Sequence, residues 1–245
     1  MRSSIRIRKR DCGLILPEFQ SCAAPELAGI FDVEEVSRWS SCVIPPYNQG
    51  SLGSCVGHAT ANYVEAVLRS VLGKSVFRSP MQINSEAIYH KGREMFWKGQ
   101  PGEGLLLHQG FQAAQELGIV PPGKIRDVAL DLRSISRQLR DTPLVMGQMI
   151  HRGWSSASTE NGLIKSSRAK LGGHAILMTA ILRQAGETFV QFLNSWGREW
   201  GYGGFGMLNE HDYLAGQYTR CLWVDVDSDA WKKHNGWRQY VIKKI

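Results

Sequence analysis

A cysteine, a histidine and an asparagine lie in segments whose local patterns suit nucleophilic chemistry. Cys55 ends the glycine-rich stretch 48–55 and begins a run of helical periodicity. A thiol at a helix N-terminus lies near the positive end of the helix dipole and near unpaired backbone N–H groups, which favour the reactive thiolate. Free cysteine is also commonly a core residue, so Cys55 taken alone leaves an inert role open.

His174 and Asn194 occupy the ends of two neighbouring apolar stretches. The residues between these stretches include Gln-Ala-Gly-Glu at 184–187, which is typical of a hairpin turn, so Asn194 is predicted to lie within a few residues of facing His174. An asparagine oxygen that accepts from one imidazole nitrogen fixes the ring and leaves the other nitrogen for a thiol. Cys55, His174 and Asn194 therefore suit the roles of nucleophile, base and orienting group.

The elements that must position these residues change in character along the chain. Helical spacing and helix-end signals predict helices over 55–72, 79–95, 105–117 and 131–140, the second opened by Ser79 and Pro80. After Pro143, strands are expected over 144–150, 174–182, 188–193, 205–208 and 221–226. Helices followed by strands predict an α+β fold with two lobes, and ligand sites occur preferentially in clefts between lobes.

The net charge of +7 is concentrated at the two ends of the 245-residue chain. Residues 1–10 carry five basic residues and no acid, and the same holds after Ala230. The rest of the chain is slightly acidic, so we expect no nucleic-acid partner. We interpret 1–30 as a basic N-terminal extension and 227–245 as a basic, aromatic tail. Either both ends are solvated or they touch an anionic surface.

The aromatic residues of the tail allow two interpretations of its role. Trp231, Trp237 and Tyr240 alternate with lysine and arginine, which suits either a partner-binding or membrane-surface strip, or packing of the tail back onto the body. Asp225, Asp227 and Asp229 alternate in a way that also suits a calcium site, but an exposed strand edge is the preferred interpretation because the glycine turn and distal glutamate of a calcium loop are missing.

Several classes of protein are excluded by the sequence. No apolar run reaches the roughly 18 residues of a spanning helix, so no membrane span is expected. The apolar stretch 14–16 is too short for a signal peptide, so we expect a cytoplasmic protein or one exported by a route without a standard signal. Five cysteines without CxxC spacing leave at least one thiol outside any internal disulfide, and histidines without ligand spacing predict no metal site.

Three segments together resemble the papain-like cysteine peptidases, the family of papain and the cathepsins. The stretch 49–55 has the pattern Q-G-S-x-G-S-C, which keeps Gly53, Ser54 and Cys55 of the signature around the family's nucleophile. Residues 172–175 look like the family's histidine motif, and 194–205 look like its asparagine motif nearly throughout. The resemblance spans about 31–226. It implies a helical N-terminal lobe (31–142), an antiparallel sheet or barrel lobe (143–226) and an active site in the cleft between them.

The resemblance assigns roles residue by residue. It implies that Cys55 is the nucleophile, that His174 forms an ion pair with it and later protonates the leaving amine, and that Asn194 orients the imidazole. Gln49 and the backbone N–H of Cys55 would form the oxyanion hole. The implied activity is hydrolysis of peptide bonds in a peptide or protein substrate, as an endopeptidase, by a monomer that needs no cofactor.

The residues implied for substrate binding are small or aromatic. Trp196 would cover the bond between His174 and Asn194, and Gly147, Gly173 and Ala175 would wall the family's main apolar pocket. Small side chains leave a roomy pocket, which favours bulky apolar side chains in the substrate.

The sequence departs from the family pattern in ways that bear on compartment and control. Leu52 stands where many members have a disulfide cysteine, so a reducing compartment is acceptable, and His58 stands where an apolar or aromatic residue is usual. Only about 30 residues precede the resemblance, so we expect a divergent member, of microbial or phage type, without the long inhibitory propeptide. Two alternatives stay open: an acyltransferase or deamidase on the same triad, and a catalytically silent binding module of papain fold.

Overall fold

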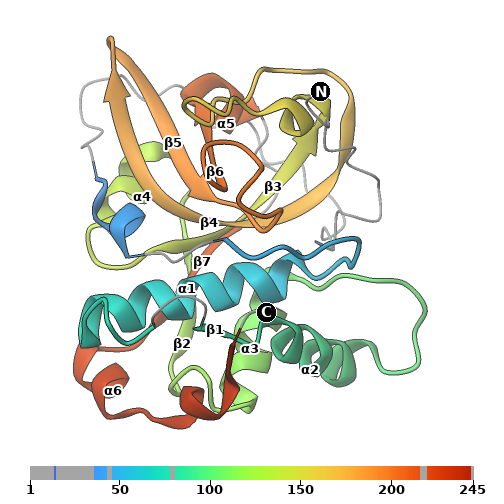
Figure 1. Ribbon diagram of the computed structural model, residues 1–245, viewed down its shortest axis with the longest axis vertical. Coiled ribbons are helices and arrows are strands. Elements are labelled where there is room, and N and C mark those ends of the chain that lie inside the picture. Colours follow the sequence, from blue (N-terminus) through green and yellow to red (C-terminus); the bar gives the residue numbers. More distant parts are fainter. Residues whose placement is uncertain (1–13, 15–35, 43–45, 78–80, 216–219, 244–245) are drawn as a thin grey trace.

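The chain folds into a sheet lobe and a helical lobe stacked one above the other (Figure 1). The computed structural model describes residues 14, 36–42, 46–77, 81–215 and 220–243. Most of the predicted N-terminal extension, 1–30, lies outside these residues. In Figure 1 the sheet lobe is above, the helical lobe is below, and helix α1 (Cys55–Leu72) runs along the boundary between them.

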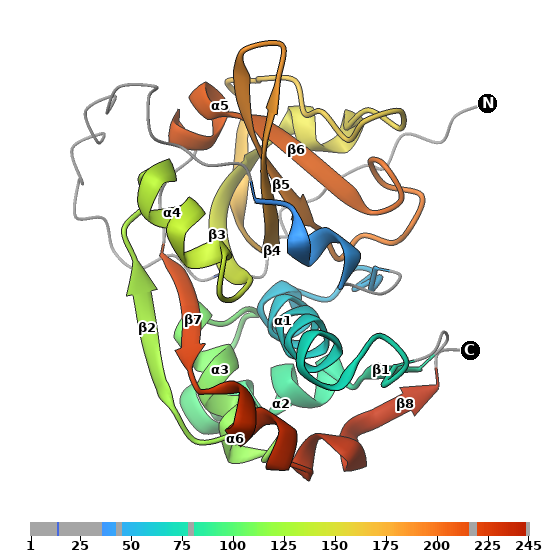
Figure 2. The same cartoon turned by 90° about the vertical axis from the view of Figure 1, so that its left-hand side faces the viewer.

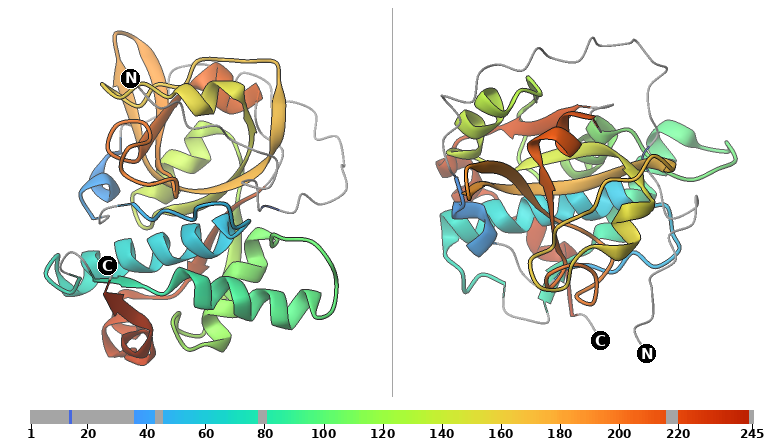
Figure 3. Two further views of the ribbon diagram at one scale, coloured as in Figure 1. Left: turned by 45° about the vertical axis from the view of Figure 1, so that its right-hand side comes forward. Right: turned by 90° about the horizontal axis from the view of Figure 1, so that it is seen from above.

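Helix α1 is buried over most of its length because it lies between the lobes. It begins and ends where the sequence predicts. It packs against the long strand β4 (Lys170–Gln184) of the sheet lobe, beneath which it passes in the view from above (Figure 3). A β-carbon at Gly57 would lie 2.7 Å from the carbonyl oxygen of Ser85, and this missing side chain lets α2 (Ser85–Trp97) approach closely.

The predicted start of the second helix is wrong. Residues 78–80 lie outside the described part of the chain, Met81–Ile83 form strand β1, and α2 begins at Ser85. Asn84 caps the helix, because its side chain accepts a hydrogen bond of 3.0 Å from the backbone N–H of Ala87. Strand β1 pairs with β8 (Val241–Lys243), a partner from the other end of the sequence that local periodicity cannot reveal.

The sheet lobe is built on six antiparallel strands in the order β2-β7-β3-β4-β5-β6. Its strands, besides β4, are β2 (Lys124–Val128), β3 (Leu144–His151), β5 (Glu187–Leu193), β6 (Phe205–Asn209) and β7 (Cys221–Asp225). The other helices are α3 (Leu107–Glu116), α4 (Leu132–Leu139), α5 (Glu210–Ala215) and α6 (Ser228–Lys233). Short 3-10 helices are η3 (Arg38–Ser41), η4 (Arg152–Ser156) and η5 (Gly236–Tyr240). The α+β prediction with an antiparallel second lobe is confirmed.

The predicted hairpin joins β4 to β5. Gln184 pairs with Glu187, and the two residues between them, Ala185 and Gly186, have φ values of 51° and 83°, as a two-residue turn with positive φ at both positions requires. The hairpin places Leu193 opposite Leu177, so the residue after β5, Asn194, lies near the cleft end of β4. Strand β4 begins at Lys170 and not at the predicted start, His174, because residues 170–174 pair with the end of β3.

Strands β2 and β7 connect the lobes along one side of the molecule (Figure 2). The sequence did not predict β2, because its side chains are mostly exposed and lack the apolar alternation of a half-buried strand.

The C-terminal segment packs on the helical lobe. Trp231 and Trp237 are each 2 % exposed, and the Trp237 ring lies 5.3 Å from that of Phe77. Packing against the body is therefore the correct reading for these two tryptophans. The acidic residues nearby have protein partners: Asp225 pairs with Arg126 at 3.0 Å, and the Asp227 side chain caps α6.

Candidate active site

Cys55 is the first residue of α1 and is fully buried beneath the sheet lobe. The backbone N–H of Ala175 donates to the Cys55 sulfur over 3.4 Å. Because Ala175 follows His174 in the chain, this contact brings the thiol of the helical lobe next to the histidine of the sheet lobe. A donor at the sulfur and the N-terminal end of a long helix both stabilise a thiolate.

His174 and Asn194 meet as the hairpin predicts. His174 Nε2 lies 2.7 Å from Asn194 Oδ1, which also accepts from the backbone N–H of Ser195 at 2.8 Å. Because the backbone group is a donor, the shared atom is the amide oxygen, and the neutral imidazole must carry its proton on Nε2. His174 Nδ1 is then the basic nitrogen. It is buried and has no hydrogen-bond partner among the described residues.

A cluster of four aromatic rings packs beside the bond between His174 and Asn194, and two of them contact the imidazole. The Trp196 ring stacks on the imidazole with centroids 4.6 Å apart. Trp154 lies edge-on to His174 at 6.1 Å and stacks on Phe192 at 5.0 Å. Trp200 donates from its indole nitrogen to the Trp154 carbonyl at 2.7 Å. His174 and Asn194 are both fully buried beside these rings.

Trp154 was missed by the sequence analysis. It lies in η4, a short 3-10 helix after β3, in a stretch without periodicity or a recognisable motif. Only the three-dimensional packing of 152–156 against the asparagine motif reveals its position, and no local signal in the sequence could have found it.

The loop before Cys55 is bonded to the asparagine motif. Gln49 donates its backbone N–H to the Ser195 carbonyl at 2.9 Å, and its side-chain oxygen accepts from the Ser195 hydroxyl at 2.6 Å. The Gln49 amide nitrogen donates to the Leu52 carbonyl at 2.9 Å. These bonds fix the rotamer of the Gln49 amide beside the turn that leads into Cys55.

The buried carboxylate of Glu65 also holds this loop in place. Glu65 on α1 accepts hydrogen bonds from the Tyr47 hydroxyl and from the backbone N–H of Ile83. Burial raises the pKa of Tyr47 well above its usual value, and the nearby Glu65 charge adds to this effect. The Tyr47 carbonyl in turn accepts from the Gly197 N–H at 2.8 Å, which ties the loop to the residue after Trp196.

His58 lies one turn along α1 from the nucleophile position and is 3 % exposed. Its Nδ1 is 3.0 Å from the carbonyl oxygen of Ser54, which also accepts the backbone N–H of His58 at 3.1 Å. The imidazole lies edge-on to Tyr47 at 5.3 Å. An imidazole thus anchors the residue immediately before Cys55, at the position where the resemblance leads one to expect an apolar side chain.

The electrostatic setting of His174 favours the neutral imidazole. Complete burial lowers the pKa of His174 to about 4, the bond to Asn194 opposes this shift, and repulsion from His58 adds to it. Burial therefore favours an uncharged His174 imidazole over the ion pair with Cys55 that the resemblance implies.

The residues implied for substrate binding lie together on β3 and β4. Gly147 pairs with Ala175 across the two strands, and Gly173 pairs with Met149 one step along the same face. All three small residues are buried. Trp196, the fourth residue implied for substrate binding, stacks on the His174 ring.

Leu14 from the N-terminal part of the chain lies against this wall. Its backbone N–H donates to the Gly173 carbonyl at 3.3 Å, and it forms a parallel bridge with Leu105 of the helical lobe. Leu14 is 6 % exposed. A residue far from the catalytic segments in sequence therefore lies between the two lobes, bonded to the residue before His174.

Two properties bear on other kinds of site. Among the described residues, no group of three or more His, Cys, Asp or Glu side chains is placed to hold a metal ion. In that same part of the chain, no helix has the length and apolar character needed to cross a membrane.

The overall structure is similar to those of several cysteine proteases. Xylellain from Xylella fastidiosa superimposes with a TM-score of 0.59 at 18 % identity, over 91 % of this chain and 99 % of that one. Bromelain from Ananas comosus gives 0.60 at 14 % identity, over 79 % and 99 % of the two chains. A digestive procathepsin L of Tenebrio molitor gives 0.65 at 16 % identity, over 89 % and 77 %.

The likeness is one of structure, since no protein-family model and no curated protein matches this sequence. It extends over most of the chain, which has N-terminal helices and a C-terminal antiparallel sheet. The chain has the fold of the papain-like cysteine proteases.

Proposed function

We propose that this chain is a cysteine peptidase that hydrolyses peptide bonds through an acyl-enzyme on Cys55. The observation that carries the proposal is the buried bond between His174 Nε2 and Asn194 Oδ1, formed beside a thiol at the N-terminus of α1. The bond holds the imidazole in the tautomer whose other nitrogen is basic. A histidine with only a structural role would gain nothing from a tautomer that directs its basic nitrogen to a neighbouring cysteine.

The reaction follows from these roles. His174 Nδ1 takes the thiol proton, and the Cys55 sulfur attacks the substrate carbonyl carbon to form a C–S bond. The oxyanion is held by the Gln49 amide and the Cys55 backbone N–H. The imidazolium gives its proton to the amine nitrogen as the C–N bond breaks. Water then attacks the thioester, with His174 accepting its proton, and the acid product leaves as the thiol is restored.

Labelling of Cys55 by a peptide vinyl sulfone, followed by mass spectrometry, tests this proposal. We expect rapid modification of Cys55 that is lost in His174→Ala and kept in His108→Ala, a matched change of a half-buried histidine on α3. Cys42 and Cys221 serve as internal references because both are buried free thiols, and burial raises the pKa of Cys221. Labelling of Cys55 that is slow and indifferent to His174→Ala would instead support a binding module.

Product analysis separates hydrolysis from the alternative chemistry of the same thioester. We expect a bulky apolar residue to be favoured in the cleaved peptides, since Gly147, Gly173 and Ala175 lie together on β3 and β4 and carry no large side chain. Internal cleavage to a free acid and a free amine supports a peptidase. Transfer of the acyl group to an added amine without hydrolysis, or release of ammonia from glutamine side chains, supports the transferase or deamidase.

A further inference from the structure

A cavity of about 460 Å³ opens in the sheet lobe, away from Cys55. Its walls are the end of β3, the segment before β4 and helix α5, and the residues that line it are Met149, His151, Ser166, Ser167, Arg168, Lys170, His211, Asp212 and Ala215. A volume of this size suits a side chain or small ligand. None of these residues takes part in the chemistry proposed above.

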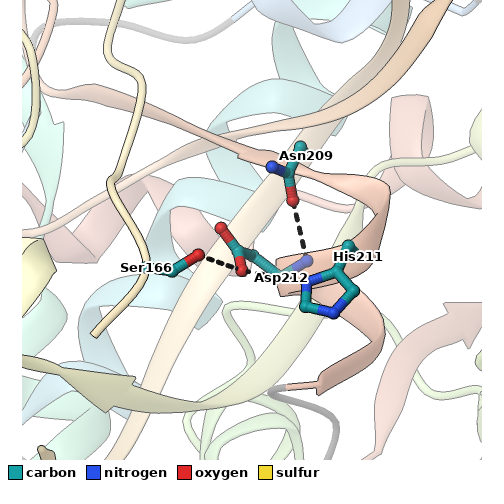
Figure 4. Close-up of polar contacts among 4 residues, drawn as sticks. All are labelled: Ser166, Asn209, His211 and Asp212. Carbon is teal, nitrogen blue, oxygen red and sulfur yellow. Dashed lines mark hydrogen bonds and ion pairs between the residues drawn. The ribbon is translucent and has the colours of Figure 1, made fainter. Parts of the chain in front are cut away.

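A buried carboxylate joins two walls of this cavity (Figure 4). The Ser166 hydroxyl donates to Asp212 Oδ1, and His211 Nδ1 lies 3.4 Å from the same oxygen. The backbone N–H of Asp212 donates to Asn209 Oδ1 at 2.8 Å. The Asp212 side chain is 7 % exposed, whereas that of His211 is 87 % exposed. Asp212 therefore fixes the segment before β4 to α5 and leaves His211 at the mouth.

Two of the residues around the opening carry positive charge, and several others can donate hydrogen bonds. Of the described residues that line the cavity, Asp212 is the one acid, while Arg168 and Lys170 are exposed basic residues. His151 Nδ1 accepts from the Gly153 N–H at 3.1 Å, so its neutral ring carries the proton on Nε2 and is a donor. Such a lining complements a ligand that is anionic and rich in acceptors.

One residue of the cavity lining, Met149, belongs to the strand that carries the wall beside His174. Gly147 and Met149 alternate along β3 and share one face, and the pairing with β4 shifts register between Ile150 and His151. Met149 lies directly opposite Gly173, whose carbonyl holds the backbone of Leu14. An extended segment bonded to Gly173 thus lies one residue pair from the cavity, and a neighbouring side chain of that segment is within reach of it.

We propose that this cavity is a subsite for an aspartate or glutamate side chain of the peptide bound in the cleft, held by Arg168 and Lys170. The inference rests on the proposed function and names a substrate class for it: peptides that combine a bulky apolar residue with a nearby acid. Asp212 serves as the anchor that holds the cavity open and does not contact the peptide.

The affinity of peptides for the inactive Cys55→Ala protein measures the proposed preference for an acid directly. Fluorescent peptides that differ only in carrying glutamate or glutamine at one position, scanned along the peptide, are compared by anisotropy at low and high salt. We expect one position at which glutamate binds about three- to tenfold more tightly, as two partly exposed ion pairs provide. The preference should shrink with salt and vanish in Arg168→Gln/Lys170→Gln. Lys74→Gln/Lys98→Gln, on the helical lobe, is the matched control.

The outcomes distinguish this inference from the proposed function. If the active enzyme cleaves neutral peptides but no position prefers glutamate, the subsite is refuted and the peptidase stands. A glutamate preference that persists in Arg168→Gln/Lys170→Gln also overturns the subsite, because the acid is then recognised elsewhere. If no peptide is bound or cleaved, the peptidase proposal itself fails, and the subsite fails with it.

Discussion

The backbone N–H of Leu14 donates to the carbonyl oxygen of Gly173, the residue immediately before His174. Leu14 is buried between the lobes and also bridges to Leu105. Under the proposed function, a peptide that binds beside Cys55 would compete with Leu14 for this position. The sequence led us to expect no long inhibitory propeptide, yet a single described residue of the N-terminal part already fills this position.

Leu14→Asp is therefore expected to speed the labelling of Cys55. Burying a leucine side chain contributes about 1.5 to 3 kcal/mol, so replacing it by a carboxylate should release the contact and raise the labelling rate about tenfold or more. The measurement is the rate of vinyl-sulfone modification by mass spectrometry. Met95→Asp, a change at an exposed apolar residue on α2, controls for added charge. Equal labelling rates in wild type, Leu14→Asp and Met95→Asp would show that Leu14 does not limit access to Cys55.

Protonation of His174 is expected to make the protein less stable in acid. Burial lowers its pKa to about 4, against about 6.5 in an unfolded chain, so the unfolded state binds the proton first. The contribution of neutral His174 to the free energy of unfolding is fully present above about pH 7 and is lost as the pH falls from about 6.5 to about 4. The total loss from this residue is about 3 kcal/mol.

Urea unfolding at pH 7.5 and pH 4.5 measures this contribution. Wild type should lose about 2 to 3 kcal/mol more than His174→Gln between the two pH values. The comparison with the variant cancels the other histidines whose pKa burial lowers, His108 and His151. An identical loss in both proteins would mean that His174 is not held neutral by burial.

The Ser195 hydroxyl is expected to act through Gln49. It donates to Gln49 Oε1 at 2.6 Å and so fixes the amide whose nitrogen would stabilise the oxyanion. Ser195→Ala should lower kcat about tenfold with KM unchanged, because the oxyanion exists only in the transition state. Gln49→Ala, which removes the donor itself, should cost about 10²- to 10³-fold.

A structural role alone for Ser195 predicts a different result. Loss of folding would lower Tm and the yield of active sites without changing kcat per labelled Cys55. Ser41→Ala, which removes an exposed hydroxyl bonded within η3, should leave both constants unchanged. A wild-type kcat in Ser195→Ala would refute the positioning role.

The sequence predicted the parts of the fold whose signals are local. Helix α1 has a glycine stop and continuous helical spacing, and the β4–β5 hairpin has a turn with the required positive φ values at Ala185 and Gly186. The placement of His174 near Asn194 followed from that hairpin alone. These features needed no knowledge of distant parts of the chain.

The features that were missed depend on partners far away in sequence. Strand β1 exists because β8 pairs with it, and β2 because it pairs with β7. Trp154 reaches His174 only through the packing of η4 on the asparagine motif. The contact between Leu14 and Gly173 joins residues 159 positions apart. No periodicity in a single segment encodes such contacts.

His58 offers a final test, because it carries an ionisable group where the resemblance leads one to expect an apolar one. A charge on His58 disfavours a second charge on His174 and lowers its pKa, while His58 Nδ1 holds the Ser54 carbonyl. His58→Gln keeps a donor and removes the charge, and His58→Phe removes both. The His174 pKa, followed by NMR of the imidazole, should rise in both variants. Only His58→Phe should also lose about 1 kcal/mol of stability in urea, since only it leaves the carbonyl without a side-chain donor. An unchanged His174 pKa in both variants would show that the two imidazoles are not coupled.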